Sequence, residues 1–259
     1  MDKTDILTPL QTKVLGYLFS QEWFRHRFYL TGGTALAAFH LQHRRSDDLD
    51  FFTHGAGLEP APALMREMGR EIGETVESAQ ASPGFLRFRV GASLQVDLVA
   101  DVDFRVGAPE LIGGFMVDTI KNIAVNKVCA ILGRLDAKDY VDLYAIFQHE
   151  AFDVFELLEL GQKKDAGLDP FVWASLLAEI VKLPVLPRMV RPLDRKALDR
   201  FFLGLRDSIL DRLKRTANFE IHPDAGSQSS GETPGARRRR NSSHGRQGTP
   251  RIVRRSPPQ

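Results

Sequence analysis

A short stretch, residues 28–52, limits the possible folds more than any other part of the chain, because an apolar run, two glycines and an acidic pair follow one another there. Gly32-Gly33-Thr34 stands where a strand is predicted to end and a helix to begin. Glycines at such a turn let the backbone approach a phosphate group closely, and the start of a helix offers N–H groups without partners. Many helices begin after glycine, so the turn alone is weak evidence. Gly32, Gly33 and Thr34, whose hydroxyl can donate one more hydrogen bond, are candidate phosphate-binding residues.

The acidic pair strengthens this interpretation. Asp48 and Asp50 flank Leu49 in a predicted strand, and residues two apart on a strand point to the same face. Two carboxylates so close together repel each other unless a cation lies between them. Carboxylates beside a phosphate site suit Mg²⁺, which is usually held by one or two of them together with substrate phosphates. Without the glycines upstream, an exposed acidic turn would be the better explanation.

A two-metal site needs a further carboxylate, and Asp97 fits. It lies between Val96 and Leu98 in a strand that alternates strongly. Asp101 and Asp103 share its parity and are rivals, but they fall closer to a loop. We therefore predict that Asp48, Asp50 and Asp97 are the metal ligands.

Hydrophobic periodicity predicts the remaining elements, which alternate in type up to residue 117 and are helical from 119 onward. The predicted helices are 6–22, 34–42, 62–77, 119–134, 137–149, 152–162, 170–182 and 193–215, and the predicted strands are 27–30, 49–53, 85–90 and 94–100. This order predicts an α+β fold, in which an α/β core (1–117) with a mixed sheet is followed by a helical domain (118–216) and a disordered basic tail (217–259).

Charge is distributed unevenly along the chain. Residues 225–259 carry eight arginines and one acidic residue, a charge of +7, so the rest of the chain carries −5 of the total of +2. The body therefore lacks the basic surface of a general DNA-binding domain. The tail is either an electrostatic arm for nucleic acid or a solvated segment without a selected role.

Cysteine content and hydropathy indicate the compartment. The single cysteine, Cys129, excludes an internal disulfide framework and fits a reducing environment. The first residues lack the apolar segment of a signal peptide, and no apolar run approaches the ~18 residues that a membrane span needs. We expect a cytoplasmic protein that does not contact a membrane.

The motifs together resemble a known superfamily. Residues 30–34, thirteen further residues, Asp48-Leu49-Asp50 and the later Asp97 are similar to the pattern of the polymerase-β-like nucleotidyltransferases, although many members carry serine where Thr34 stands. More narrowly, residues 28–52 and 118–144 resemble the AbiEii/AbiGii-type toxin family, the enzymatic halves of some bacterial toxin–antitoxin and abortive-infection systems. The second segment matches the helical pattern of that family at Lys127, Arg134, Lys138, Asp139 and Asp142.

Lys127 and Arg134 are two turns apart and share one face of a helix. A cationic face beside the carboxylates would hold a triphosphate and offset the charge that develops in phosphoryl transfer. Asp139 and Asp142, three apart on the next helix, would orient these cations. The alternative is an interhelical salt-bridge cluster, which we favour for Asp142 but not for Lys127. We expect Lys127 and Asp139 to act in catalysis and Lys127 and Arg134 to bind the nucleotide.

The resemblance implies a reaction and its partners. Two Mg²⁺ ions would bridge Asp48, Asp50 and the phosphates of an NTP, and Asp97 would help to activate an acceptor hydroxyl. A nucleoside monophosphate would then pass to RNA, such as the 3′ end of tRNA, and a cognate antitoxin would restrain the toxic outcome. Two alternatives stay open: nucleotidylation of a protein, such as AMPylation, and a non-catalytic nucleotide-binding protein.

Some residues near the motif give weaker evidence of a function. The histidines at 26, 40, 43 and 54 have no zinc-binding spacing and are expected to be ordinary. Arg44 and Arg45 are expected either to touch substrate or to form a solvated basic turn.

Overall fold

The computed structural model describes residues 6–53 and 57–221, and the described residues up to Asn218 form one compact unit. A second unit begins at Phe219. The last described helix, α9 (Arg195–Ile221), includes the first residues of the predicted tail, and the rest of that tail lies outside the described residues. No helix in the described part of the chain combines the length and the apolar character that crossing a membrane requires.

The unit is built on a mixed sheet of seven strands in the order β3-β4-β5-β2-β1-β7-β6. Strand β2 pairs antiparallel with β1 and parallel with β5, while β4 pairs antiparallel with β5. The strands are β1 (Phe28–Thr31), β2 (Leu49–Thr53), β3 (Val76–Ser82), β4 (Phe85–Val90), β5 (Leu94–Ala100), β6 (Glu110–Ile112) and β7 (Phe115–Val117). The predicted α+β class is confirmed.

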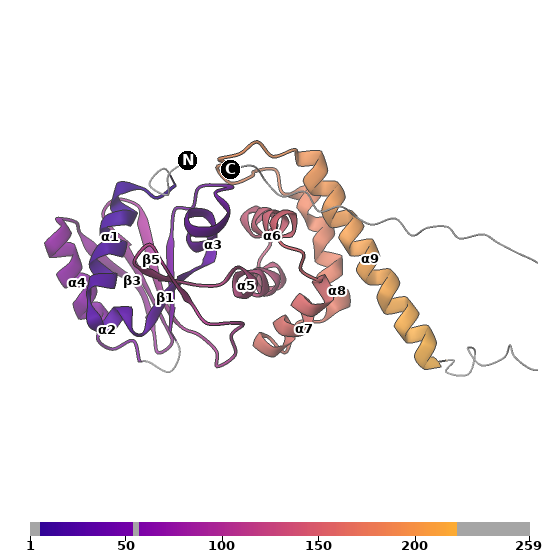
Figure 1. Cartoon of the computed structure of the whole chain (residues 1–259), viewed down its shortest axis with the longest axis horizontal. Coiled ribbons are helices and arrows are strands. Elements are labelled where there is room, and N and C mark those ends of the chain that lie inside the picture. Colours follow the sequence, from indigo (N-terminus) through magenta and orange to yellow (C-terminus); the bar gives the residue numbers. More distant parts are fainter. Residues whose placement is uncertain (1–5, 54–56, 222–259) are drawn as a thin grey trace, which may run out of the picture. The chain divides into compact units, whose positions relative to one another are not determined.

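Helices lie on both sides of this sheet (Figure 1). Helices α1, α2 and α4 cover one face, and α5 lies beyond the opposite face with α6, α7 and α8 packed behind it. The helices are α1 (Pro9–Ser20), α2 (Glu22–Arg25), α3 (Gly32–Ala35), the π-helix η2 (Leu36–Leu41), α4 (Ala61–Ile72), α5 (Ile120–Gly133), α6 (Ala137–His149), α7 (Val154–Lys164), α8 (Pro170–Leu176) and the 3₁₀-helix η3 (Leu177–Lys182).

Caps and burial explain where the helices near the site begin. The side chain of Thr119 accepts a hydrogen bond from the Asn122 N–H at the start of α5, and Asp136 does the same for the Lys138 N–H at the start of α6. A continuous hydrophobic core runs from α1 through the sheet into α5, α6, α8 and α9. Buried apolar contacts therefore hold α5 and α6 in the same core as the sheet.

Some predicted boundaries were wrong. The helix predicted at 62–77 ends at Ile72, because Gly73 takes a left-handed conformation (φ 74°) that ends α4. Residues 76–82 form strand β3 instead, which the sequence did not reveal because its side chains are almost all exposed at the edge of the sheet. The short strands β6 and β7 were missed as well. The helix predicted at 6–22 is α1 followed by α2, with the break at Gln21, whose backbone is extended.

Candidate active site

Sheet register brings two of the predicted carboxylates side by side. Asp50 on β2 is the cross-strand partner of Asp97 on β5, and Asp97 is the partner of Arg87 on β4. We call Asp50, Asp97 and Arg87 the carboxylate row. Asp97 Oδ1 accepts a hydrogen bond from Arg87 Nε at 2.9 Å, and Asp97 Oδ2 accepts one from Arg87 Nη2 at 2.7 Å. Arg87 therefore holds Asp97 in a bidentate ion pair.

Burial and the neighbouring charge of Asp97 disfavour the ionised forms of Asp50 and Asp48. Burial raises the pKa of Asp50 to about 6, and the neighbouring charge of Asp97 adds to this effect. Asp48 lies half-buried just before β2, and its pKa is raised by burial and by the charge of Asp97. Carboxylates whose ionised forms are destabilised in this way gain from a nearby cation.

The glycine turn packs directly on the row. Gly32 has a φ of 68°, which favours glycine, and a Cβ at this position would lie 2.3 Å from Asp50 Oδ2. Position 33 favours glycine for another reason, because a Cβ there would lie 2.4 Å from Arg44 Nη2. Gly32 thus lets the backbone approach a carboxylate, and Gly33 makes room for a buried guanidinium.

Thr34 is already bonded within the chain. Its side chain is 1% exposed, and its hydroxyl donates a hydrogen bond to the carbonyl oxygen of Asp48. This bond ties the start of the helix to the start of β2 and fixes the position of Asp48. A phosphate contact by the Thr34 hydroxyl stays a prediction, and it would require this bond to exchange.

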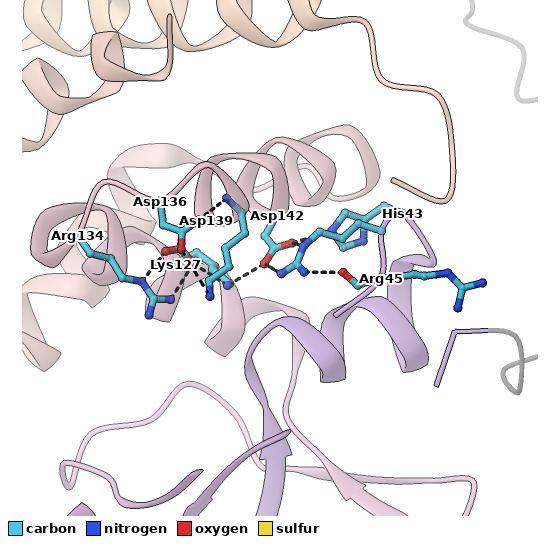
Figure 2. A network of polar contacts seen from close by, with 9 residues as sticks. His43, Arg45, Lys127, Arg134, Asp136, Asp139 and Asp142 are labelled. Atoms are coloured by element: carbon cyan, nitrogen blue, oxygen red, sulfur yellow. Dashed lines mark hydrogen bonds and ion pairs between the residues drawn. The ribbon is translucent and has the colours of Figure 1, made fainter. Parts of the chain in front are cut away.

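A charge network joins His43 to side chains of α5 and α6, as Figure 2 shows. Asp142 on α6 is fully buried and accepts hydrogen bonds from His43 Nε2 at 2.7 Å and from Arg44 Nε at 2.6 Å. A second bond from Arg44 reaches Asp142 Oδ2 at 2.7 Å. Burial alone would raise the pKa of Asp142, but the charges of Lys127 and Arg44 outweigh it and hold the pKa well below its usual range.

Lys127 on α5 completes the network. Its Nζ lies 2.8 Å from Asp139 Oδ1 and 2.7 Å from Asp142 Oδ2, and Arg134 Nε donates to Asp139 Oδ2 at 2.8 Å. Burial by itself would lower the pKa of Lys127, but the charges of Asp142 and Asp139 outweigh it and raise the pKa. The interhelical salt bridges considered from the sequence are therefore present. Three permanent cations, namely Arg44, Lys127 and Arg134, face two carboxylates.

The carboxylate row and α5 line one cavity of about 470 Å³. Of the residues predicted to form the site, the cavity wall includes Gly32, Asp50, Asp97, Lys127 and Arg134. Asp48, Gly33, Thr34 and Asp139 lie outside this wall, and so do the rival carboxylates Asp101 and Asp103. A larger hollow of about 680 Å³ lies beside α4 and contains none of the predicted site residues. The cavity at the carboxylate row is therefore the candidate active site.

Sequence reasoning did not identify Arg87 as part of this site, nor His43 and Arg44 as the partners of Asp142. Arg87 shares the strand parity of the cavity-lining face, but its pairing with Asp97 depends on a register that no local pattern specifies. Arg44 is 3% exposed, so the solvated basic turn considered for it is wrong, whereas Arg45 is exposed. His43 is buried on Asp142 rather than an ordinary surface histidine.

The side chains at this site meet only part of what a divalent metal requires. In the parts of the chain that the structure describes, no three histidine, cysteine or acidic side chains are gathered closely enough to hold a metal by themselves. Asp97 is turned toward Arg87. Asp48 and Asp50, with raised pKa values and no more than partial burial, still supply the two carboxylates that Mg²⁺ typically takes from a protein when substrate phosphates supply other ligands. The residues fit a metal that binds together with a phosphorylated substrate.

Comparisons with known proteins agree with this geometry. A Helicobacter pylori protein called JHP933 has the same fold, with a TM-score of 0.53 and 19% identity over 83% of this chain and 94% of that one. A second Helicobacter pylori structure, of a candidate nucleotidyltransferase, gives a TM-score of 0.54 and 19% identity over 80% and 94%. An uncharacterized protein of Aquifex aeolicus is 30% identical over 149 residues, which are 55% of this chain and 68% of that protein.

A mixed sheet that sets a glycine turn and a carboxylate row opposite a cationic helix defines a nucleotidyltransferase, and this chain is an enzyme of that class. It belongs to the family described as "Nucleotidyl transferase AbiEii toxin, Type IV TA system", whose model matches residues 13–220. The predicted family and enzyme class are confirmed. The family has a toxin–antitoxin context, and it generally uses an NTP and a divalent metal.

Proposed function

We propose that this chain transfers a nucleoside monophosphate from an NTP to the 3′ end of a tRNA, with Mg²⁺ as its metal. The observation that supports this most strongly is the single cavity in which Asp50 and Asp97 stand opposite Lys127. Negative groups for a metal and a cation for phosphate are the two requirements of phosphoryl transfer. The carboxylate row supplies the negative groups, and Lys127 and Arg134 of the network in Figure 2 supply the cations on the wall of the same cavity.

The proposed metal site uses the residues nearest the glycine turn. Asp48 and Asp50 would hold two Mg²⁺ ions together with the NTP phosphates, and Asp97, which is paired with Arg87, would be the third ligand. When bound, the ions neutralise charge on the phosphates and on the leaving pyrophosphate. Gly32 has no side chain, so the backbone of the turn lies directly against the Asp50 carboxylate, and we propose that the phosphates bind beside this contact.

The protein groups then act on the acceptor and the donor. Asp97 accepts the proton of the acceptor hydroxyl, whose oxygen forms a bond to the α-phosphorus while the bond from that phosphorus to the bridging oxygen breaks. Pyrophosphate leaves with the electron pair of the broken bond. Lys127 and Arg134 belong to a network with one more permanent positive charge than negative, so they attract the triphosphate. Asp139 orients both cations.

Two features of the chain support RNA as the acceptor. Family membership places the activity in a toxin–antitoxin context, and a nucleotide added to the 3′ end of tRNA would account for toxicity. The arginines of residues 225–259 add a positive charge suited to a phosphate backbone. An antitoxin encoded with this chain would restrain the reaction, and we expect the reaction to take place in the cytoplasm, where NTPs are available.

The test is incubation with each of the four α-labelled NTPs, Mg²⁺, total tRNA and a bacterial protein extract, followed by separation of RNA from protein. We expect label in tRNA from at least one NTP. Periodate-oxidised tRNA, which lacks the 3′-terminal diol, is the matched control and should take no label. Label in protein instead of RNA would contradict the proposed acceptor, and label in neither would contradict the proposed function.

A further inference from the structure

A second row of side chains follows the carboxylate row along the same face of the sheet. Phe52 on β2 is the cross-strand partner of Val99 on β5, and Val99 is the partner of Phe85 on β4. Each lies two residues from a member of the carboxylate row, so the rows are about 6.7 Å apart. We call these three residues the apolar row. All three line the cavity.

The apolar row is not part of the hydrophobic core. Phe52, Val99 and Phe85 are half-buried and lie outside the core clusters, although the Phe52 ring meets the buried ring of Tyr29 edge to face, with the ring centroids 6.3 Å apart. Arg87 lies over the Phe85 ring, with its guanidinium carbon 5.2 Å from the ring centroid. Two aromatic rings on a cavity wall without a core to bury them form a surface on which a flat ligand group can pack.

The opposite wall leaves room for such a group. It is formed by α5, which presents the small residues Ala130 and Gly133 to the cavity. A Cβ at Gly133 would meet no atom within 4 Å. The apolar row and this part of α5 therefore enclose a slot between aromatic rings and small side chains.

A polar group stands beside the slot. Asn126 also lines the cavity, and its Oδ1 accepts a hydrogen bond from Lys164 Nζ at 2.6 Å. The Lys164 side chain is 6% exposed, so it holds the amide firmly. Because a lysine only donates, the oxygen of Asn126 must face it, and the amide NH₂ is left as a donor. Within residues 6–53 and 57–221, the NH₂ group of Asn126 donates no hydrogen bond.

We propose that this slot binds the nucleobase of the NTP and that Asn126 reads an acceptor atom on the edge of the base. The inference rests on the proposed function, which places the phosphates at the carboxylate row. The spacing of the two rows is comparable to the span of a ribose between its 5′-phosphate and its base. Aromatic packing binds every base, whereas the amide donor distinguishes bases by the acceptors they present.

The decisive measurement is equilibrium binding of α,β-methylene NTPs, which cannot transfer a nucleotide, compared with binding of inorganic tripolyphosphate. Phe85→Ala should weaken binding of the nucleotides by about 5- to 150-fold, the loss typical of one base–aromatic contact. Tripolyphosphate binding should change by less than about twofold, because the phosphates contact the other row. Phe85→Trp should retain nucleotide binding. Phe171→Ala, which removes an aromatic ring that is 61% exposed on α8, is the matched control.

Other variants keep the proposal testable if Phe85→Ala fails to fold. Gly133→Leu should fill the slot and exclude nucleotides while tripolyphosphate still binds. Asn126→Ala should bring the four nucleotide affinities closer together.

Two results for Phe85→Ala would overturn the slot assignment: affinity losses that are equal for nucleotides and tripolyphosphate, or unchanged binding of both. Unchanged nucleotide binding together with a raised KM for tRNA would also overturn it, because the slot would then bind the acceptor. Unchanged ratios among the four nucleotides in Asn126→Ala would overturn the role of the amide. A wild-type protein that shows the expected binding but transfers nothing would contradict the proposed function and leave the slot assignment standing.

Discussion

Replacing Asp50 with asparagine should stabilise the metal-free protein although it removes a proposed metal ligand. The pKa of Asp50 is about 6 in the folded chain against 3.8 as its ordinary value. Because the folded pKa is raised, the contribution of this group to stability is complete below pH 3.8 and is lost as the pH rises through about 6. At pH 8 the ionised carboxylate costs about 3 kcal/mol, at 1.36 kcal/mol per pKa unit. The asparagine variant does not carry this cost.

The assay is urea denaturation of both proteins in EDTA from pH 4 to pH 8. The stability difference should be about 0.5 kcal/mol at pH 4 and rise to at most about 3 kcal/mol in favour of the variant at pH 8. Added Mg²⁺ should stabilise the wild type and reduce the stability difference between the two proteins, because a cation offsets the carboxylate charge. Asp47→Asn, at an exposed position, is the control and should stay within about 0.5 kcal/mol. A difference that does not change with pH would refute the reasoning.

Two further variants test the cations. Lys127→Met leaves two buried carboxylates with one partner fewer, and because each keeps another cation we expect a loss of about 3 kcal/mol in chemical denaturation, together with weaker NTP binding. Lys121→Met, in an exposed ion pair of the same helix, should cost less than about 1 kcal/mol, and an equally small loss for Lys127→Met would contradict the network. Arg87→Ala frees Asp97 and should tighten Mn²⁺ binding roughly tenfold in a titration, while Arg89→Ala, a more exposed arginine on the same strand, should not. Unchanged or weaker Mn²⁺ binding by Arg87→Ala would argue against Asp97 as a ligand.

Local sequence patterns predicted the elements that build the carboxylate row. Strands 49–53, 85–90 and 94–100 match β2, β4 and β5, because each alternates clearly or is bounded by turn residues. Gly32 was predicted to let the backbone approach a phosphate, and that stays a prediction; the group that it approaches in the structure is the carboxylate of Asp50. Strand β3 escaped detection because an exposed edge strand has no apolar face to reveal it.

The pairings within the site could not be predicted from the sequence. Asp97 meets Arg87 only because β4 and β5 pair in one particular register, and Arg44 meets Asp142 across 98 residues of chain. Such contacts are set by tertiary packing, which local periodicity does not encode. Family resemblance identified Lys127 and Asp139 as a pair of interest but did not show that Lys127 is shared between Asp139 and Asp142.

The central claim is that the carboxylate row performs nucleotide transfer. Its most direct test is the single-turnover rate of label transfer from an α-labelled NTP to tRNA in Mg²⁺, measured for the wild type and for Asp50→Asn. The structure predicts a folded variant whose rate falls by at least about 100-fold, the loss typical of removing one group that stabilises transition-state charge. A folded Asp50→Asn variant that transfers label at a rate close to that of the wild type would contradict the account.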